Sequence, residues 1–371
     1  MDSDKVIVFL TGTLDAGGLE RFISRISIEV RHKKIFTPIV ICLHKRAGIF
    51  LTELQSHGVA VYEAPSGWER NLSSLIRLGT MIRNLQPHAV HSQVNFSLVQ
   101  QFLAVRLFSS ARFLVTERNC YPLTGFSRLK RIAQFYFLKI FGTHYSGNSV
   151  AVAKYLAAMV RYPFKKIPVI PNGIEIPEAN AGIREQIRSQ HGWRKDDFVI
   201  GYVARFAGHK GQGYFVSVLE WLHEQVGDRV KVCFIGDGPE RSTVQIKLQQ
   251  IGLQRLVIFT GIIPNVSDYY QAFDCVALLS DYEGMPNVVL EAMACGLPVV
   301  ANPVGNVEEL LESGAGYINR SANPEITAGL FIALATSPAA CAASGNLARE
   351  KIRKDFSLQA TVRLLQNQYG V

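Results

Sequence analysis

Short apolar segments alternate with longer amphipathic stretches along the whole chain. Such segments are typical of buried strands, and the amphipathic stretches between them are typical of helices. Strands separated by one helix each need crossover connections, which give a parallel sheet covered by helices on both faces. The predicted strands are Val6–Leu10, Pro38–Leu43, Ala60–Ala64, Ala89–Ser92, Phe113–Thr116, Val199–Ala204, Val230–Ile235, Val257–Thr260, Cys275–Leu279 and Pro298–Ala301. The pattern restarts near residue 196, so the chain is predicted to be an α/β protein with two doubly wound sheets.

Composition along the chain predicts where the two domains begin and end. Residues 176–195 are polar and include proline and glycine, so they are predicted to be the linker between an amino-terminal domain at 1–175 and a carboxyl-terminal domain at 196–355. Residues 356–371 carry an apolar stripe at helical spacing, which predicts a helix with one buried face. The stripe consists of Phe356, Leu358, Val362, Leu365 and Tyr369.

Length and composition agree with a globular protein of two domains. The chain has 371 residues, too many for one ordinary core, with 48% apolar and 19% charged residues. No apolar run reaches the ~18 residues of a spanning helix, and the start Met1–Lys5 is acidic, so neither a spanning helix nor a secretory signal is predicted. The six cysteines lack Cys-x-x-Cys spacing and are predicted to be reduced thiols of a cytoplasmic protein.

Positive charge is concentrated in the first half of the chain. Residues 1–175 hold 22 Lys and Arg against 10 Asp and Glu, a net of +12, whereas the whole chain holds 39 against 30, which leaves −3 for the remainder. Within that half, residues 126–141 interleave Arg128, Lys130, Arg131 and Lys139 with aromatic and aliphatic residues. Such a helix can lie on an anionic membrane surface or be a buried helix with a snorkelling edge. The charge favours the membrane; no motif for nucleic acid accompanies it, so none is predicted as a partner.

The most informative segment of the chain, residues 281–300, carries two carboxylates eight residues apart. A Gly-Met-Pro turn places Glu283 in a loop before a helix and Glu291 about two turns into it, so both can face one cleft. The alternative is a surface helix with two solvated glutamates; the surrounding Gly and Pro residues favour the first interpretation. Backbone N–H groups at the predicted helix start would form an anion site, and these belong to Gly284, Met285, Asn287 and Val288.

Several segments together resemble one enzyme family. Residues 281–300 resemble the donor-binding signature of the family-4 retaining glycosyltransferases, which have the GT-B fold. The other matching segments are 201–211 with the family's Arg…Lys pair, 234–239 with its second-strand loop, 169–174 with its interdomain element, and 15–21 with its glycine loop. They occur in the family's order between residue 6 and about residue 310. The resemblance implies two Rossmann-like domains facing across a cleft, one for the acceptor and one for the donor, with the terminal helix crossing back to the first domain.

The resemblance also implies roles for the residues of the second domain. Glu291 would hydrogen-bond the ribose of the nucleotide, and Glu283 the hydroxyls of the donor sugar. The amides after Gly284 would hold phosphate and sugar, and Gly236 would belong to the donor loop. These roles supply binding rather than proton transfer.

Arg205 and Lys210 follow the first predicted strand of the second domain. A guanidinium and an ammonium can neutralise the charge that builds on a departing nucleoside diphosphate, without a metal. The alternative is a basic surface loop. Because ligands of such sheets bind at the carboxyl ends of strands, the functional interpretation is favoured.

Gly17 and Gly18 follow the first strand and open a predicted helix at Leu19–Val30. A dinucleotide site would need an acid at the end of the second strand, and Leu43–Lys45 contains none. A phosphate-binding P-loop would need Ser or Thr after Gly-Lys, and Lys210–Gln212 does not match. The glycine loop is therefore predicted to be a lip against the diphosphate and the acceptor.

Polar residues end the strands of the first domain. His91 is a candidate catalytic residue and sugar contact. Many relatives in the family carry His-x-His at this place, whereas here Gln93 stands at the second position. The alternative is that His91 has a structural role. Glu117, Arg118 and Asn119 follow the next strand and are predicted to line the acceptor side, although Glu117 and Arg118 could instead pair with each other. His144 and Ser146 are assigned to the same face.

Together these features predict a retaining glycosyltransferase, cytoplasmic and peripheral on the inner face of the cytoplasmic membrane. It would move a sugar from a nucleoside-diphosphate sugar to a lipid-linked saccharide in surface polysaccharide or lipopolysaccharide assembly. A UDP-sugar is favoured as donor, UDP-N-acetylhexosamine among the candidates. No cofactor or metal is predicted, because Arg205 and Lys210 supply the positive charge. The alternatives are a sugar-nucleotide epimerase, a phosphorylase, and a non-catalytic subunit that binds sugar nucleotides.

Overall fold

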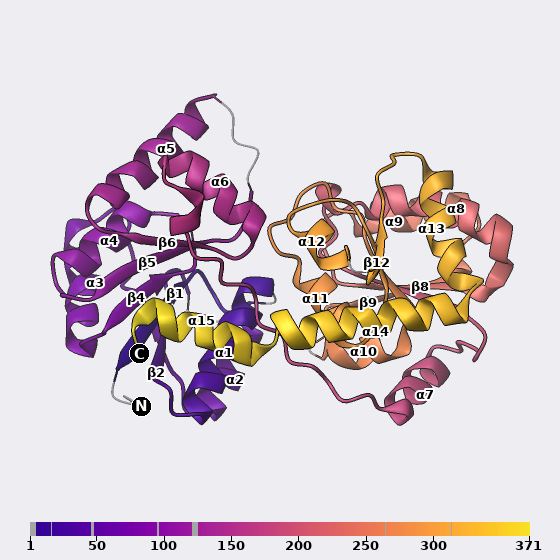
Figure 1. Cartoon of the computed structure of the whole chain (residues 1–371), viewed down its shortest axis with the longest axis horizontal. Helices are drawn as coiled ribbons and strands as arrows, with labels where there is room; N and C mark the ends of the chain where they lie inside the picture. Colours follow the sequence, from indigo (N-terminus) through magenta and orange to yellow (C-terminus); the bar gives the residue numbers. More distant parts are fainter. Residues whose placement is uncertain are drawn as a thin grey trace. The chain divides into compact units, whose positions relative to one another are not determined.

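The chain folds into two compact units, each built on one six-stranded sheet (Figure 1). The computed structural model describes residues 5–15, 17–45, 48–94, 96–120, 125–263, 265–312 and 314–371. The first unit comprises Met1–Gly173 and Leu358–Val371, and the second comprises Ile174–Ser357. The prediction of an α/β fold with two doubly wound sheets is confirmed.

The sheet of the first unit is entirely parallel, with the strand order β3-β2-β1-β4-β5-β6. Its strands are β1 (Val6–Thr11), β2 (Thr37–Cys42), β3 (Ala60–Glu63), β4 (Ala89–Ser92), β5 (Arg112–Glu117) and β6 (His144–Gly147). Its helices are α1 (Gly18–His32), α2 (Ile49–Ser56), α3 (Leu72–Leu85), α4 (Leu98–Arg106), α5 (Gly125–Ile140), α6 (Val150–Val160), the 3₁₀ turn η1 (Phe164–Lys166) and α15 (Leu358–Tyr369).

Two hydrophobic cores lie on the two faces of this sheet. Ile7 and Phe9 of β1 enter one core with α1, α2 and α15, while Val8 and Leu10 enter the other with α3, α4, α5 and α6. Successive strand residues point to opposite faces, and helices cover both faces, so this central strand is an unbroken apolar run.

The second unit repeats this architecture, with the strand order β12-β11-β10-β7-β8-β9. Its strands are β7 (Phe198–Val203), β8 (Val230–Ile235), β9 (Val257–Gly261), β10 (Cys275–Leu278), β11 (Val299–Ala301) and β12 (Gly316–Ile318). Its α-helices are α7 (Ala181–Gln190), α8 (Gln212–Val226), α9 (Arg241–Gln250), α10 (Val266–Ala272), α11 (Asn287–Ala294), α12 (Val307–Leu311), α13 (Pro324–Ala335) and α14 (Pro338–Asp355). Its 3₁₀ turns are η2 (Gly208–Lys210), η3 (Gly227–Arg229) and η4 (Gln254–Leu256).

The stretch expected to be a linker, residues 176–195, instead contains helix α7 of the second unit. Asn180 caps this helix by accepting hydrogen bonds from the N–H groups of Gly182 and Ile183. Arg188, which is buried, donates to the Asp274 carboxylate at 3.2 Å. The polar composition suggested a linker because charged and polar side chains dominate α7, although Ile183 and Ile187, one turn apart, pack into the core of the second unit.

Strands β6 and β12 were not predicted from the sequence. Strand β6 reads His-Tyr-Ser-Gly and β12 reads Gly-Tyr-Ile, so neither has the apolar run that marks the other strands. Each lies at one end of its sheet, where pairing on one side is enough to hold it.

In the described part of the chain no single helix has the length and apolar composition to cross a membrane. Helices α13 and α14, taken together, pass that test by length and composition only, with a bend of 94° between them.

Candidate donor and acceptor sites

Two loops of the second unit meet at the carboxyl edge of its sheet, one after β7 and one after β10. The N–H of Asp281 donates to the carbonyl of His209 at 2.8 Å, and the ring of His209 stacks on Tyr282 at 4.6 Å. The Tyr202 hydroxyl, at the end of β7, donates to the carbonyl of Lys210 at 2.5 Å. These contacts hold the predicted phosphate loop against the predicted sugar loop.

The ammonium of Lys210 lies 2.6 Å from Oε1 of Glu283, and both side chains are partly buried. Arg205 is exposed and makes no ion pair with any residue that the structure describes. The structure thus brings together two residues that the sequence analysis selected separately, and it leaves the third charge accessible.

Glu291 lies on α11, one turn after its start rather than the two turns expected. It is buried, and Oε2 accepts a hydrogen bond from the Tyr270 hydroxyl of α10 at 3.0 Å. Pro286 precedes α11 and no side chain caps the helix, whose first residues Asn287 and Val288 are half-buried. The macrodipole of α11 therefore adds positive potential at the edge of the sheet where Lys210 also lies.

Two glycines let these loops approach each other. Gly236, after β8, has φ +133°, and a Cβ there would lie 2.2 Å from the carbonyl oxygen of Ala204. Gly211 has φ +76°, and a Cβ there would lie 2.1 Å from the carbonyl oxygen of Leu279. Any larger residue at either position would force the neighbouring loops apart, so both glycines are needed for the close packing of these loops.

Gly17 and Gly18 begin α1 in the first unit, while Ala16 of the same loop lies outside the described residues. A Cβ on Gly17 would lie 2.2 Å from Oε2 of Glu20, so the glycine makes room for that carboxylate. Burial raises the pKa of Glu20 above its usual value, and Arg118 opposes this. The loop was expected to be a lip against the diphosphate and the acceptor; the structure places the Glu20 carboxylate beside it, and the role of the loop stays a prediction.

His91 is 1% exposed at the end of β4. One ring nitrogen lies 2.5 Å from the hydroxyl of Tyr369, and the other lies 2.6 Å from the hydroxyl of Thr116. Burial, and then the charge of Arg118, lowers the pKa of His91 to about 3, so the ring is neutral. The expectation of a sugar contact is corrected, because protein hydroxyls occupy both nitrogens.

Glu117 is fully buried at the end of β5 and holds the turn that follows it. Oε1 accepts the N–H groups of Arg118 at 2.9 Å and Asn119 at 3.3 Å. Oε2 accepts from the Arg131 guanidinium of α5 at 2.8 Å. Glu117 therefore holds the backbone of the predicted acceptor loop through hydrogen bonds, and its buried carboxylate is not at the surface where an acceptor could touch it.

The guanidinium of Arg118 turns away from Glu117. It donates to Oε1 of Gln93 and, at 2.7 Å, to Oδ1 of Asn172, and it covers the Phe22 ring at 4.3 Å. Burial lowers the pKa of Arg118 to about 10. Gln93, Arg118 and Asn172 thus form one polar cluster at the carboxyl edge of the first sheet. His144 is exposed, whereas Ser146 is buried with its hydroxyl 2.7 Å from that of Thr116.

Comparison with known proteins agrees with this geometry. Residues 16–177 match the family described as Glycosyltransferase Family 4, and residues 183–351 match Glycosyl transferases group 1. The chain belongs to the family-4 glycosyltransferases of the GT-B fold.

Among curated relatives, the glycosyltransferase is 24% identical to the putative glycosyltransferase EpsF of Bacillus subtilis, over 100% of this chain and 97% of that protein. It is 25% identical to the Vi polysaccharide biosynthesis protein VipC/TviE of Salmonella typhi, over 84% of this chain and 62% of that protein. Its fold is that of Anabaena Alr3699/HepE, solved in complex with UDP, with a TM-score of 0.84 at 20% identity over 99% of both chains.

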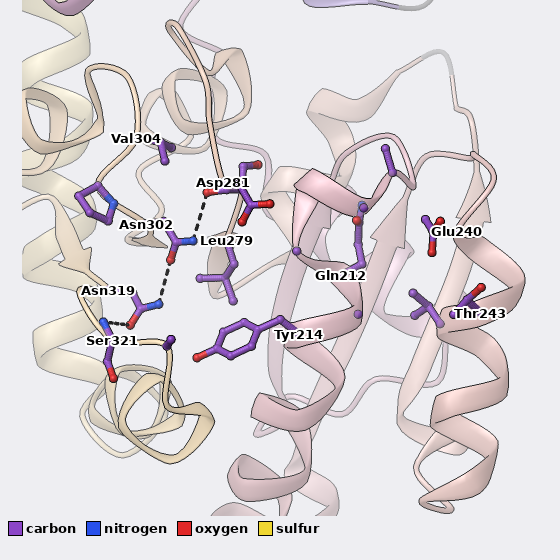
Figure 2. Close-up of a pocket in the computed structure, with 18 of the residues that line it drawn as sticks. Gln212, Tyr214, Glu240, Thr243, Leu279, Asp281, Asn302, Val304, Asn319 and Ser321 are labelled. Carbon is purple, nitrogen blue, oxygen red and sulfur yellow. Dashed lines mark hydrogen bonds between the residues drawn. The ribbon is translucent and has the colours of Figure 1, made fainter. Parts of the chain in front are cut away.

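A cavity of about 700 Å³ lies next to the donor loop of this glycosyltransferase (Figure 2). Gly211 and Asp281 are among the residues that line it, and so are Asn302 and Asn319. These two asparagines bond to each other at 2.8 Å, and Asn302 also donates to the carbonyl of Ser280 at 3.1 Å, as Figure 2 shows. Arg205, Lys210, Glu283 and Glu291 do not line the cavity. The cavity and the predicted donor residues are therefore separate features of this part of the second unit.

The sequence analysis missed several residues that build these sites. Tyr270, Asn172 and Tyr369 contact predicted residues from distant parts of the chain, and Arg131 was seen only as a surface charge. No local pattern identifies such partners, because each contact depends on how strands and helices stack. Among the described residues no group of three or more His, Cys, Asp and Glu side chains could hold a metal ion.

Proposed function

We propose that this glycosyltransferase moves a sugar from a nucleoside-diphosphate sugar to an acceptor hydroxyl with retention of configuration at the anomeric carbon. The observation that carries the proposal is the Lys210–Glu283 contact of 2.6 Å beside the start of α11. It joins a phosphate-binding cation to a carboxylate that can accept hydrogen bonds from sugar hydroxyls. Glu291, one turn along α11, is the proposed partner of the ribose hydroxyls.

The positive groups of the second unit would act on the leaving group. As the bond between the anomeric carbon and the diphosphate oxygen breaks, negative charge grows on that oxygen. Arg205 and Lys210 are proposed to stabilise this charge, so that no metal is needed. The sequence offers no carboxylate nucleophile, so the acceptor oxygen is proposed to attack from the leaving-group side and to give its proton to the departing phosphate.

A UDP-sugar is the favoured donor, and UDP-N-acetylhexosamine is among the candidates. A protein with the same fold was solved in complex with UDP, which supports uracil as the base of the donor. The sequence identity of 20% leaves the sugar of the donor open. The acceptor is proposed to be a lipid-linked saccharide. The name of VipC/TviE supports polysaccharide biosynthesis as the setting of the reaction. Such an acceptor would place the enzyme on the inner face of the cytoplasmic membrane.

A thermal-shift screen of UDP- and GDP-sugars tests the donor first. A ligand at 100 times its dissociation constant stabilises the folded state by about 2.7 kcal/mol. We expect a UDP-sugar to raise the melting temperature of the wild type and to do so less in Arg205→Ala. Arg255→Ala is the matched control, because Arg255 pairs with Asp228 on an exposed surface.

The products formed from the donor that binds then distinguish a transferase from the alternative functions. A transferase releases UDP and lengthens an acceptor; an epimerase releases an altered sugar nucleotide without an acceptor; a non-catalytic subunit binds donor without consuming it. Stabilisation by no sugar nucleotide at all would contradict the proposal.

A further inference from the structure

Helix α5 of the first unit has apolar side chains on two opposite sides. Phe135 and Leu138 are fully buried and pack into the core against the sheet. The other side is uncovered in this structure: Phe126 is 82% exposed, Leu129 66% and Ile140 65%. Tyr136, Phe137 and Phe141 are also exposed large hydrophobic residues.

The exposed side chains of α5 form one stripe. With about 100° of rotation per residue, positions 126, 129, 133, 136, 137 and 140 fall within an arc of about 100°. The buried residues Phe135 and Leu138 lie on the opposite side of the same helix. Large exposed apolar patches of this kind mark surfaces that bind a partner. Sequence alone allowed the helix to be a core helix; the burial pattern shows that only one side of it is.

The surroundings of the stripe are basic and lack acids. Residues 118–174 contain nine Lys and Arg and no Asp or Glu. Lys139 of α5 reaches the end of α6, where its ammonium lies 3.4 Å from the carbonyl of Val160 and 4.7 Å above the Tyr162 ring. Lys166 of η1 lies over the same ring at 5.8 Å. The cations and aromatic rings of α5, α6 and η1 are therefore continuous in space.

We propose that this surface inserts into the interface of an anionic lipid bilayer. We call it the membrane face; it consists of Phe126, Arg128, Leu129, Lys130, Tyr136, Phe137, Lys139, Ile140, Phe141, Tyr162, Phe164, Lys165 and Lys166. Aromatic and aliphatic side chains enter the acyl boundary while flanking Lys and Arg contact phosphate headgroups. The inference deepens the proposed function, on whose lipid-linked acceptor its biological purpose rests.

Charge favours a bilayer over a second copy of the chain as the occupant. Two copies joined through this face would bring their cations against each other, with no carboxylate from residues 118–174 to separate them. An anionic membrane supplies the opposite charge and the apolar phase together.

One cation of α5 does not belong to the membrane face. Arg131 binds the fully buried Glu117, and the exposed fractions of their side chains are 15% and 0%. Reversing Arg131 would therefore break the anchor of the 117–119 turn as well as change the surface charge. Arg128 and Lys130 are exposed and can be reversed without touching that pair.

The test is co-flotation of the full-length protein with vesicles, without donor or acceptor, so that it does not depend on transferase activity. Vesicles of phosphatidylcholine alone are compared with vesicles containing one quarter phosphatidylglycerol. Wild type should float with the anionic vesicles and dissociate in high salt. The Arg128→Glu/Lys130→Glu variant should bind at least 25-fold more weakly, at about fivefold for each cation lost.

An apolar variant separates insertion from simple attraction of charges. Phe126→Ser/Leu129→Ser/Ile140→Ser should lose vesicle binding while keeping its melting temperature. The matched control is Leu72→Ser/Ile262→Ser/Ile326→Ser, whose side chains are 72%, 63% and 58% exposed elsewhere. Arg353→Glu/Lys354→Glu, two exposed cations of α14, is the charge control. Both controls should bind as wild type does.

Three results would overturn the inference. The first is a wild-type protein that does not bind anionic vesicles. The second is a loss of binding in the controls as large as that in the membrane-face variants. The third is a wild-type dimer in sedimentation that the apolar variant dissociates, without any vesicle binding, which would make the face an interface between copies. Turnover of a water-soluble acceptor, measured separately, should survive in all these variants; its absence in wild type would count against the proposed function and not against the membrane face.

Discussion

The ammonium of Lys210 and the carboxylate of Glu283 lie 2.6 Å apart, although 73 positions separate them in the chain. The loops after β7 and β10 bring them together, and the Tyr202 hydroxyl holds the backbone of Lys210 in place. The pair is partly buried, so each charge lowers the cost of burying the other. Two roles assigned separately, phosphate binding and sugar binding, thus belong to one contact.

The first prediction concerns the two cations. Replacing Lys210 or Arg205 with alanine should lower kcat/KM by about 10²–10³-fold, because each is proposed to stabilise charge on the leaving diphosphate. Steady-state kinetics with the identified donor measure this, and a melting curve checks that each variant is folded. Near-normal kinetics in Lys210→Ala would remove Lys210 from the mechanism.

The second prediction separates the two carboxylates. Glu291→Gln should weaken binding of free UDP, because Glu291 is the proposed partner of the ribose hydroxyls. Glu283→Gln should keep UDP binding and impair sugar transfer. Calorimetric titration with UDP, followed by kinetics, distinguishes these outcomes. Equal losses of UDP affinity in both variants would contradict the assigned roles. Tyr270→Phe, which removes the hydroxyl bonded to Glu291, should weaken UDP binding by a smaller factor.

The third prediction concerns Arg131 and Glu117. Arg131→Met should lower the free energy of unfolding by about 3–5 kcal/mol, because it leaves the Glu117 carboxylate buried without its cation. Urea denaturation measures this. The neighbouring exposed Arg128→Met should change stability by no more than about 0.5 kcal/mol. A stable Arg131→Met protein would show that the buried pair does not support the turn.

The fourth prediction concerns the pH dependence of stability. His91 has a pKa of about 3 in the folded protein, lowered from 6.5. Between these values the unfolded state binds a proton that the folded state does not, so His91 destabilises the fold as pH falls from 6.5 towards 3. The slope from this residue is about 1.4 kcal/mol per pH unit.

Urea denaturation at pH 6, 5 and 4 should show this slope in wild type and a smaller one in His91→Gln. Tyr369→Phe is the matched control: it removes one hydrogen bond of the ring but leaves His91 buried, so the slope should remain. Identical slopes in wild type and His91→Gln would mean that His91 titrates normally in the folded state.

Much of the fold follows from local pattern. Apolar runs such as Val6–Leu10 and Val230–Ile235 are central strands, and crossover helices make their sheets parallel whatever the details of packing. Strand β6 was missed because it pairs at the edge of its sheet and has no apolar run. Helix α7 was missed because its apolar stripe is as short as Ile183 and Ile187 and its other contacts are ionic and polar.

The sequence by itself singled out Arg205, Lys210, Glu283 and Glu291, because they stand beside strand ends and glycine- or proline-containing turns; the resemblance of their segments to a known family then implied their donor roles. Only the tertiary structure decided that Lys210 meets Glu283, that His91 is sealed between two hydroxyls, and that one side of α5 is exposed. The physical reason is the distance along the chain. The spacing of residues in the sequence indicates contacts within one turn or one strand, whereas these three features depend on which helices and strands pack together in the fold.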